Sequence, residues 1–251
     1  MPVKWFNYLS IDSNAPQGLN PAWWLHHRSL ARTVKKNAYL LANEWIAANL
    51  GWHLRLPIPP FAVMRKTSST TRYFASLDFG KEIAPSDMKA SVFCDNLPVL
   101  ATGIVAFDIL IANHDRHEGN LKVDAADAPT AAELFDHDSA LFGRRSGGGN
   151  SRMASLEGKL GFSKSGGMTE VHKVASKLRT AKHFDGWMAR VDSIPDTFIH
   201  ELFQEGKDLG LSTEEADYGT DWLCRRKNSI RDIIKANKAF FPIHDWGLFY
   251  S

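Results

Sequence analysis

The chain has very little cysteine and no excess of charge of either sign. Cys94 and Cys224 are the two cysteines among 251 residues, and they lie far apart in the sequence. This usage argues against a disulfide scaffold or a zinc knuckle and is typical of a reducing compartment. Lys and Arg number 30 against 28 Asp and Glu, so the net charge of +2 gives no general attraction to nucleic acid or anionic lipid.

Long apolar runs are missing as well. No stretch reaches the length of a membrane span, and the amino terminus lacks the basic start and apolar core of a signal peptide. We therefore expect a cytoplasmic protein that does not enter a membrane. Hydrophobic residues make up 44% of the chain and charged residues 23%, which is the balance of a folded globular protein. The length suits one large domain or two small lobes.

The first third of the chain predicts a small mixed lobe. A helix is expected from Leu30 to Leu50, because the residues there are good helix formers without Pro or Gly and Gly51 follows as a cap. Three prolines between residues 57 and 60 then precede two alternating runs, 62–65 and 71–77, which predict a hairpin.

The remainder predicts a mainly helical part. Asn96 is expected to cap a helix in which apolar residues at steps of three and four form one stripe, from Leu100 to Ile111. Two short extended pieces follow, at 121–123 and 134–135. The Gly- and Ser-rich segment after Arg144 predicts a loose loop, and helices are expected from Val171 onward. The fold class is therefore α+β, with a small lobe before a larger helical one.

Chemistry is concentrated in one stretch, Asn113 to Asn120, and in the Leu-Phe-Asp-His-Asp run that ends at Asp138. Phosphoryl transfer needs a carboxylate that orients or deprotonates the acceptor hydroxyl, together with oxygen ligands for Mg²⁺. Asp115 and Asn120 lie five positions apart in a loop where Gly119 permits a tight turn. Asp136 follows a short apolar strand and can supply a second metal ligand.

Residues 111–120, with the sequence IANHDRHEGN, resemble the catalytic loop of HipA-like kinases and of the related lipid-kinase branch of the protein-kinase-like fold. The resemblance implies that Asp115 is the catalytic carboxylate, that Asn120 and Asp136 bind the metal, and that His117 braces the loop. It implies a small bacterial kinase that uses ATP and Mg²⁺ and phosphorylates Ser or Thr of a protein substrate. A two-lobed architecture follows, with a small N-lobe at 1–80 and a helical C-lobe at 81–251.

The resemblance extends upstream to residues 41–47, which look like the helix whose Glu pairs with the nucleotide-binding Lys of the family. Glu44 lies among apolar neighbours on the helical wheel, so its carboxylate needs a cationic partner. The family suggests Lys4 on an earlier strand; the possible substitutes are Lys35, Lys36 and Lys66. Three residues before Lys4 cannot form the strands and phosphate-covering loop of the family. The chain is therefore expected to be truncated at its start or to depart from the family there.

Several alternatives remain open. Asp138 could replace Asp136 as the metal ligand, because the Asp-His-Asp run leaves the register unfixed, and the motif could be a plain polar turn. His114, His117 and His137 could form a transition-metal site of a His/Asp phosphohydrolase. A pseudokinase-like module that binds nucleotide or a partner, without catalysis, is the alternative from a different class.

Overall fold

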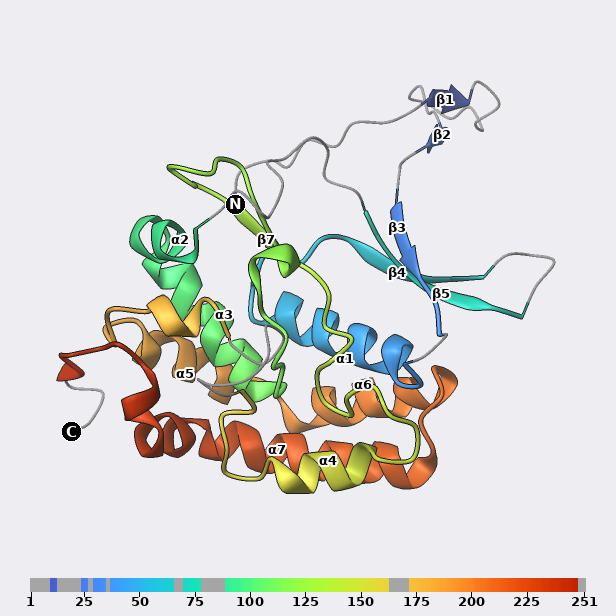
Figure 1. Cartoon of the computed structure of the whole chain (residues 1–251). Helices are drawn as coiled ribbons and strands as arrows, with labels where there is room; N and C mark the ends of the chain where they lie inside the picture. The colour runs from blue at the N-terminus through green and yellow to red at the C-terminus, as the bar shows by residue number, and fades with distance from the viewer. Residues whose placement is uncertain are drawn as a thin grey trace.

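The computed structural model describes residues 10–12, 24–26, 29–34, 37–65, 70–77, 89–162 and 172–247. In chain order the elements are β1 (Ser10–Asp12), β2 (Trp24–His26), β3 (Ser29–Arg32), α1 (Leu40–His53), β4 (Phe61–Arg65), β5 (Arg72–Leu77), α2 (Ala90–Asn96), α3 (Pro98–Leu110), η2 (Glu118–Asn120), β6 (Leu121–Val123), β7 (Ala132–Leu134), α4 (Gly149–Ser155), η3 (Ala175–Lys177), α5 (Phe184–Asp192), α6 (Asp196–Asp208), α7 (Thr213–Ala236) and η4 (Lys238–Phe240). A small sheet lies beside a larger helical part (Figure 1), which confirms the predicted α+β class.

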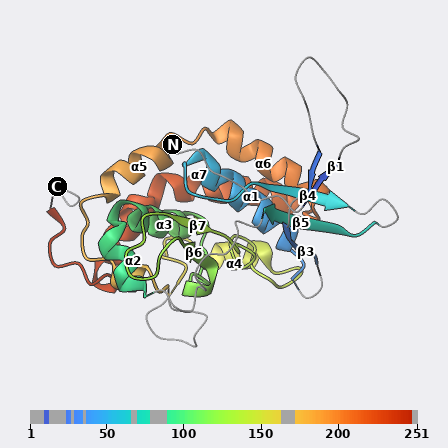
Figure 2. The ribbon, with the colours of Figure 1, turned by 90° about the horizontal axis from the view of Figure 1, so that it is seen from above.

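The small sheet is antiparallel, with strand order β3-β5-β4. The predicted hairpin is confirmed as β4 and β5, in which Val63 pairs with Phe74. Both Phe74 and Ala75 are buried, and helix α1 packs against β4 and β5. Figure 2, turned by 90°, shows this sheet at one end of the molecule and α2 and α5 toward the other.

Helix α1 lies between the sheet and α6, and ten of its 14 residues are buried. The predicted start of this helix at Leu30 is wrong. Residues 29–32 form β3 instead, because β5 provides an antiparallel partner for their backbone groups. Gly51 is not a cap either. It lies inside the helix, where a Cβ atom would stand 2.6 Å from the Ile58 side chain, so this position requires glycine for close packing.

Helix α3 is the centre of the helical part. Ten of its 13 residues are buried, so it is covered on all sides rather than along the single apolar stripe that was expected. Asn96 ends α2 instead of capping α3. The chain bends at Leu97, and Pro98 opens α3, where its missing N–H costs no hydrogen bond. Helix α7 packs against α3, α4, α5 and α6 and begins with a capping box of Ser212 and Glu215.

The Gly- and Ser-rich segment contains a helix, α4, where a loose loop was expected. Met153 in α4 is fully buried, and its carbonyl accepts a hydrogen bond of 2.8 Å from Trp222 Nε1 of α7. Tertiary packing therefore stabilises a seven-residue helix that its own sequence does not favour.

The part of the chain that the structure describes contains no single helix long and apolar enough to cross a membrane. The pair α2 and α3, bent by 116°, passes the same test of length and composition. The predicted boundary between lobes at residue 80 falls in the segment 78–88, outside the described residues, so the division into 1–80 and 81–251 stays a prediction.

Candidate active site

A buried ion pair fixes the loop that follows α3. Arg116 donates from Nε to Asp108 Oδ2 at 2.8 Å and from Nη2 to Oδ1 at 3.0 Å, and both side chains are fully buried. Arg116 Nη1 also donates to the backbone carbonyls of Asn120, at 2.8 Å, and of Phe135, at 3.0 Å. One guanidinium group thus ties the core helix α3 to both segments that carry the candidate site residues.

His172 completes the support of Asp108. Its Nδ1 accepts from the backbone N–H of Ala175 at 3.0 Å, so the ring proton lies on Nε2, which is 2.9 Å from Asp108 Oδ2. Burial alone would raise the pKa of Asp108, but Arg116 and His172 outweigh it, and the pKa lies well below its ordinary value. This cluster was not predicted from the sequence, although a single carboxylate inside an apolar helix was a signal for it.

Asp115 and Asn120 lie in this loop and are both buried. Asn120 Nδ2 donates to the Asp115 carbonyl at 2.7 Å, which leaves the amide oxygen of Asn120 as its free acceptor. Asp115 Oδ2 accepts from Arg144 at 3.1 Å and faces Ser139 Oγ at 3.5 Å. Asp115 Oδ1 is buried and has no hydrogen-bond partner within the described structure. An unpartnered carboxylate oxygen at the site is available for an acceptor hydroxyl or a cation.

His117 takes the position of a bracing residue. Its Nδ1 accepts from the backbone N–H of Gly119 at 2.9 Å, so Nε2 carries the proton and lies 3.8 Å from Asp115 Oδ1. This contact holds the ring beside the carboxylate. The predicted bracing role is consistent with this geometry and stays a prediction.

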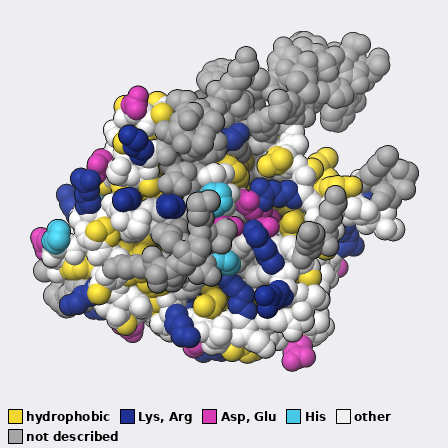
Figure 3. Space-filling model, viewed as in Figure 1, with side chains coloured by type: hydrophobic (Ala, Val, Ile, Leu, Met, Phe, Trp, Pro, Cys, Tyr) yellow, Lys and Arg dark blue, Asp and Glu magenta, His cyan; other side chains and the backbone are white. Residues whose placement is uncertain are grey.

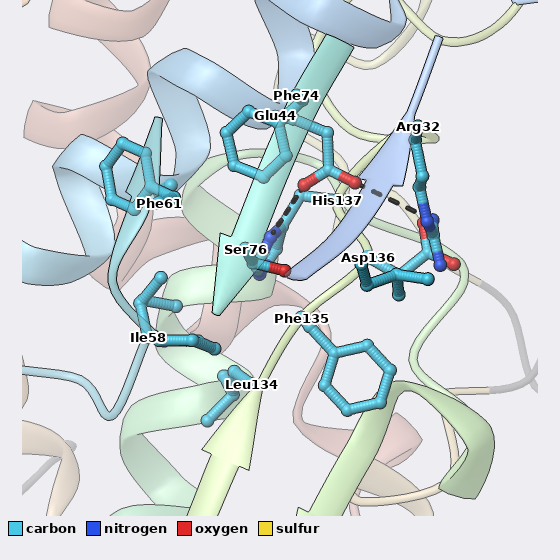
Figure 4. Close-up of a pocket in the computed structure, with 13 residues that line it drawn as sticks. Arg32, Glu44, Ile58, Phe61, Phe74, Ser76, Leu134, Phe135, Asp136 and His137 are labelled. Atoms are coloured by element: carbon cyan, nitrogen blue, oxygen red, sulfur yellow. Dashed lines mark ion pairs between the residues drawn. The ribbon is translucent and has the colours of Figure 1, made fainter. Parts of the chain in front are cut away.

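Asp136 lies at the other side of the site, directly after β7 and Phe135. Its φ of 63° is the left-handed conformation, which a non-glycine residue adopts at a cost of about 1–3 kcal/mol. Its carboxylate forms an ion pair with Arg32 of β3. Arg32 also lies 3.7 Å from Glu44 of α1, and His137 Nδ1 is 3.4 Å from the same carboxylate (Figure 4). Arg32 thus contacts both carboxylates and joins Asp136 and Glu44 in one network.

The prediction that Glu44 is buried and ion-paired is confirmed, since its side chain is 3% exposed and contacts Arg32. The cation is an Arg where a Lys was expected. Lys4, Lys35, Lys36 and Lys66 all lie outside the described residues, so their proposed roles are not tested. Arg32 was missed because residues 30–50 were predicted to be one helix.

Asp138 is bound by Arg144 and Ser139. Its Oδ1 accepts from Arg144 Nη2 at 2.8 Å and from Ser139 Oγ at 2.9 Å, and its carbonyl accepts from Asn37 and Asn43. Burial tends to raise the pKa of Asp138, but the bonds from Arg144 and Ser139 outweigh it and lower the pKa. The Asp138 carboxylate is thus occupied by hydrogen bonds from Arg144 and Ser139. This favours Asp136 as the metal ligand, a role that stays a prediction.

The acidic residues outnumber the cations around them. Among the described residues, the four carboxylates of Glu44, Asp115, Asp136 and Asp138 share the two guanidinium groups of Arg32 and Arg144, so formal charges of −4 and +2 leave −2 when histidines are left aside. Figure 3 shows acidic and histidine side chains near the middle of one face with Lys and Arg beside them. A divalent cation would balance this charge.

The donor set fits Mg²⁺ better than a transition metal. Among the residues with described positions, no three His, Cys, Asp or Glu side chains converge on one metal position, so His114, His117 and His137 form no shared site there. Mg²⁺ is commonly bound by one or two carboxylates and completed by water and substrate phosphates. Asp136 and the amide oxygen of Asn120 meet that requirement.

A pocket opens next to Asp136 and is drawn in Figure 4. It is lined by Leu30, Arg32, Glu44, Ala48, Ile58, Pro59, Phe61, Phe74, Ser76, Leu134, Phe135, Asp136 and His137. Apolar and aromatic walls with charged groups at one side suit a flat ring that carries phosphates. The free volume is only about 20 Å³, which holds about one water molecule. A purine does not fit in this volume.

Comparison with known proteins supports this architecture. No protein-family model and no curated protein sequence matches the chain. Among solved structures, a proinflammatory kinase from Helicobacter pylori, CtkA, is similar with a TM-score of 0.54 and 15% sequence identity. The match covers 90% of this chain and 94% of that one. At this identity the similarity concerns the fold, and the chain has a kinase-like fold.

Proposed function

We propose that this protein is an ATP- and Mg²⁺-dependent phosphotransferase of the HipA-like type, which phosphorylates a Ser or Thr hydroxyl of a protein. The observation that supports it most strongly is that Arg116, inside a kinase-like fold, joins the segment that carries Asp115 and Asn120 to the one that carries Asp136, through the carbonyls of Asn120 and Phe135. Composition alone would allow many other functions. The two-lobed division at residue 80 and a cytoplasmic location are parts of the same proposal.

Asp115 is proposed to act on the acceptor. Its buried, unpartnered Oδ1 can accept the hydrogen bond of an incoming hydroxyl and take its proton as transfer proceeds. Arg144 occupies Oδ2 and lies with more than half of its side chain exposed, so it can either leave or contact a transferred phosphoryl group. His117 keeps the carboxylate in position from the other side.

Asn120 and Asp136 are proposed to hold Mg²⁺, whose charge would neutralise the phosphates of the nucleotide. Arg32 now pairs with Asp136 and Glu44. In the proposed complex the Arg32 side chain turns from Asp136 to the phosphates. Its contact with Glu44 holds the guanidinium group near the site. The aromatic pocket beside it takes the base, and its narrowness requires the sheet to shift on binding.

The test is transfer of label from γ-labelled ATP to a generic protein substrate or to the protein itself. Asp115→Asn should lower transfer by about 10²-fold or more, because general-base contributions are of that size, while ATP affinity stays near normal. The matched control is Asp127→Asn, an identical change at an exposed residue of the β6–β7 loop. Full turnover by Asp115→Asn would refute the assignment of Asp115.

A second candidate function is a binding module that keeps the kinase-like fold without catalysis. Two observations favour it: Arg32 caps the candidate metal ligand Asp136, and the pocket beside them is narrow. In that case ATP or a partner would bind and no label would be transferred by the unaltered protein. ATP binding measured by calorimetry alongside the transfer assay separates the two functions.

A further inference from the structure

A second and larger cavity lies on the other side of the loop that follows α3. Its volume is about 500 Å³. It is lined by His114, Arg152, Leu156, Lys159, Leu160, Gly161, Phe162 and Asn237. This size suits a small molecule or a large side chain. None of these residues except His114 belongs to the motif discussed above, and the proposed kinase chemistry gives the cavity no role.

Arg152 forms one wall and is a half-buried cation, with no acidic partner among the described residues. Its guanidinium group donates to three backbone carbonyls, those of Leu141, of Ala112 at 2.9 Å and of Ser139 at 3.1 Å, and lies 3.3 Å from His114 Nδ1. No carboxylate of the described residues lies within ion-pair distance of it. Burial therefore lowers the pKa of Arg152 to about 10. Carbonyl groups satisfy its hydrogen bonds but leave its charge uncompensated.

Arg226 of α7 also donates to backbone carbonyls, including those of residues that line the cavity. It donates to the carbonyls of Leu156 at 2.9 Å and of Lys159 at 2.6 Å, two residues that line the cavity. Its pKa falls to about 10, mainly through burial, with Glu157 opposing the fall and the nearby charge of Arg152 adding to it. Glu157 itself is exposed and pairs with Arg225. The half-buried guanidinium group of Arg152 and the buried one of Arg226 thus repel each other near the cavity.

Lys159 is the second cation of the cavity wall. Lys159 lines it, is exposed and donates to the Ser155 carbonyl at 2.7 Å. Arg152 and Lys159 thus bring two positive charges to a concave, partly apolar space, where the field of a charge is stronger than on an open surface. Phe162 and Leu156 add apolar contacts for whatever carries the charge.

We propose that this cavity binds an oxyanion, phosphate or carboxylate, carried by a small molecule or by a side chain. The volume exceeds what a free phosphate fills, so the ligand would place its anionic group against Arg152 and Lys159 and its body against Phe162. The inference is independent of the proposed function, since it needs neither ATP nor transfer.

The ligand would act on the candidate active site through short contacts. Arg152 holds the carbonyl of Ser139, and the hydroxyl of Ser139 lies 3.5 Å from Asp115 Oδ2. Arg152 also holds Ala112 and Leu141, whose φ values of 49° and 43° are both left-handed. An anion that binds Arg152 would therefore weaken its hydrogen bonds to the carbonyls of Ala112 and Leu141.

The test is calorimetric titration at fixed ionic strength with three probes: inorganic phosphate, free phosphoserine and acetate. We expect saturable binding, and Lys159→Met should weaken it about tenfold, the loss expected for a hydrogen bond between charged groups. Lys207→Met, an identical change at an exposed residue of α6, should leave it unaltered. Phosphoserine binding more tightly than phosphate would indicate a phosphorylated side chain or ester, and acetate binding most tightly would indicate a carboxylate.

The site next to Asp115 must be distinguished, because Arg144 could also attract phosphate. Arg144→Met should keep the binding that Lys159→Met weakens. Absence of binding for all three probes would overturn the proposal, as would equal binding by the Lys159→Met and unaltered proteins. Loss of binding in Arg144→Met alone would place the anion at the candidate active site and also overturn it. Inactivity in the transfer assay with anion binding retained would refute only the proposed function.

Discussion

The buried pair of Asp108 and Arg116 should be among the most sensitive positions of the protein. Arg116→Met removes the cation and leaves a fully buried carboxylate facing His172 and Asn113 alone. Breaking a buried ion pair from one side costs about 3–5 kcal/mol, because the remaining charge stays without compensation. This is a large share of the stability of a typical domain, about 5–15 kcal/mol. Urea unfolding followed by tryptophan fluorescence measures the loss.

The matched control is Arg179→Met. Arg179 pairs with Asp95 at 3.5 Å, and the two side chains are 69% and 49% exposed. Exposed pairs of this kind contribute about 0.2–1 kcal/mol, so the control should lose little. Equal losses of unfolding free energy in Arg116→Met and Arg179→Met would refute the reasoning, because burial would then not increase the cost of breaking an ion pair.

The pH dependence gives an independent check. The pKa of Asp108 is lowered in the folded state, so its charge stabilises the fold above the unfolded value near about 4, and this stability is lost as the pH falls toward the folded pKa. Without Arg116, His172 is left to oppose the effect of burial, so the pKa of Asp108 should be higher than in the unaltered protein. The difference in unfolding free energy between the two proteins should therefore narrow as the pH falls from 7 to 3. A constant difference would mean that Asp108 is not the responsible group.

Three further outcomes are expected. Asp136→Asn should abolish the Mg²⁺-dependent part of ATP binding in calorimetry, and equal binding would remove Asp136 from the metal site. Gly103→Ala in α3 should destabilise the protein by about 1–3 kcal/mol, because a Cβ atom there would lie 2.2 Å from the Trp187 ring. Gly186→Ala in α5 meets no atom within 4 Å and should be neutral or stabilising by about 0.5–1 kcal/mol. Thermal unfolding of the two variants measures the difference. Burial raises the pKa of Cys94 to about 12, so this thiol should resist disulfide-exchange reagents at pH 8 until urea unfolds the protein, and rapid labelling in the folded state would contradict the burial.

The motif could be located from the sequence because its chemistry is local. Asp115, Asn120 and Gly119 lie within one turn, and the short strand before Asp136 is visible as two apolar residues before a polar run. The hairpin of β4 and β5 could also be predicted, since alternation and flanking breakers are properties of neighbouring residues. The α+β class followed from those elements. These features depend on interactions between residues close in the sequence.

Long-range pairing decided the rest. Residues 29–32 have helix-forming neighbours, yet β5, more than forty positions later, offers backbone partners that no local rule contains. That pairing places Arg32 beside Glu44 and Asp136, so the cation of the site came from a segment predicted to be helical. Helix α4 exists because Met153 is buried against α7. The sequence by itself determined which residues are candidates for the chemistry, through local spacing and charge. Only the tertiary structure decided which cations face them, because a buried charge selects its partner by distance in space and not by position in the chain.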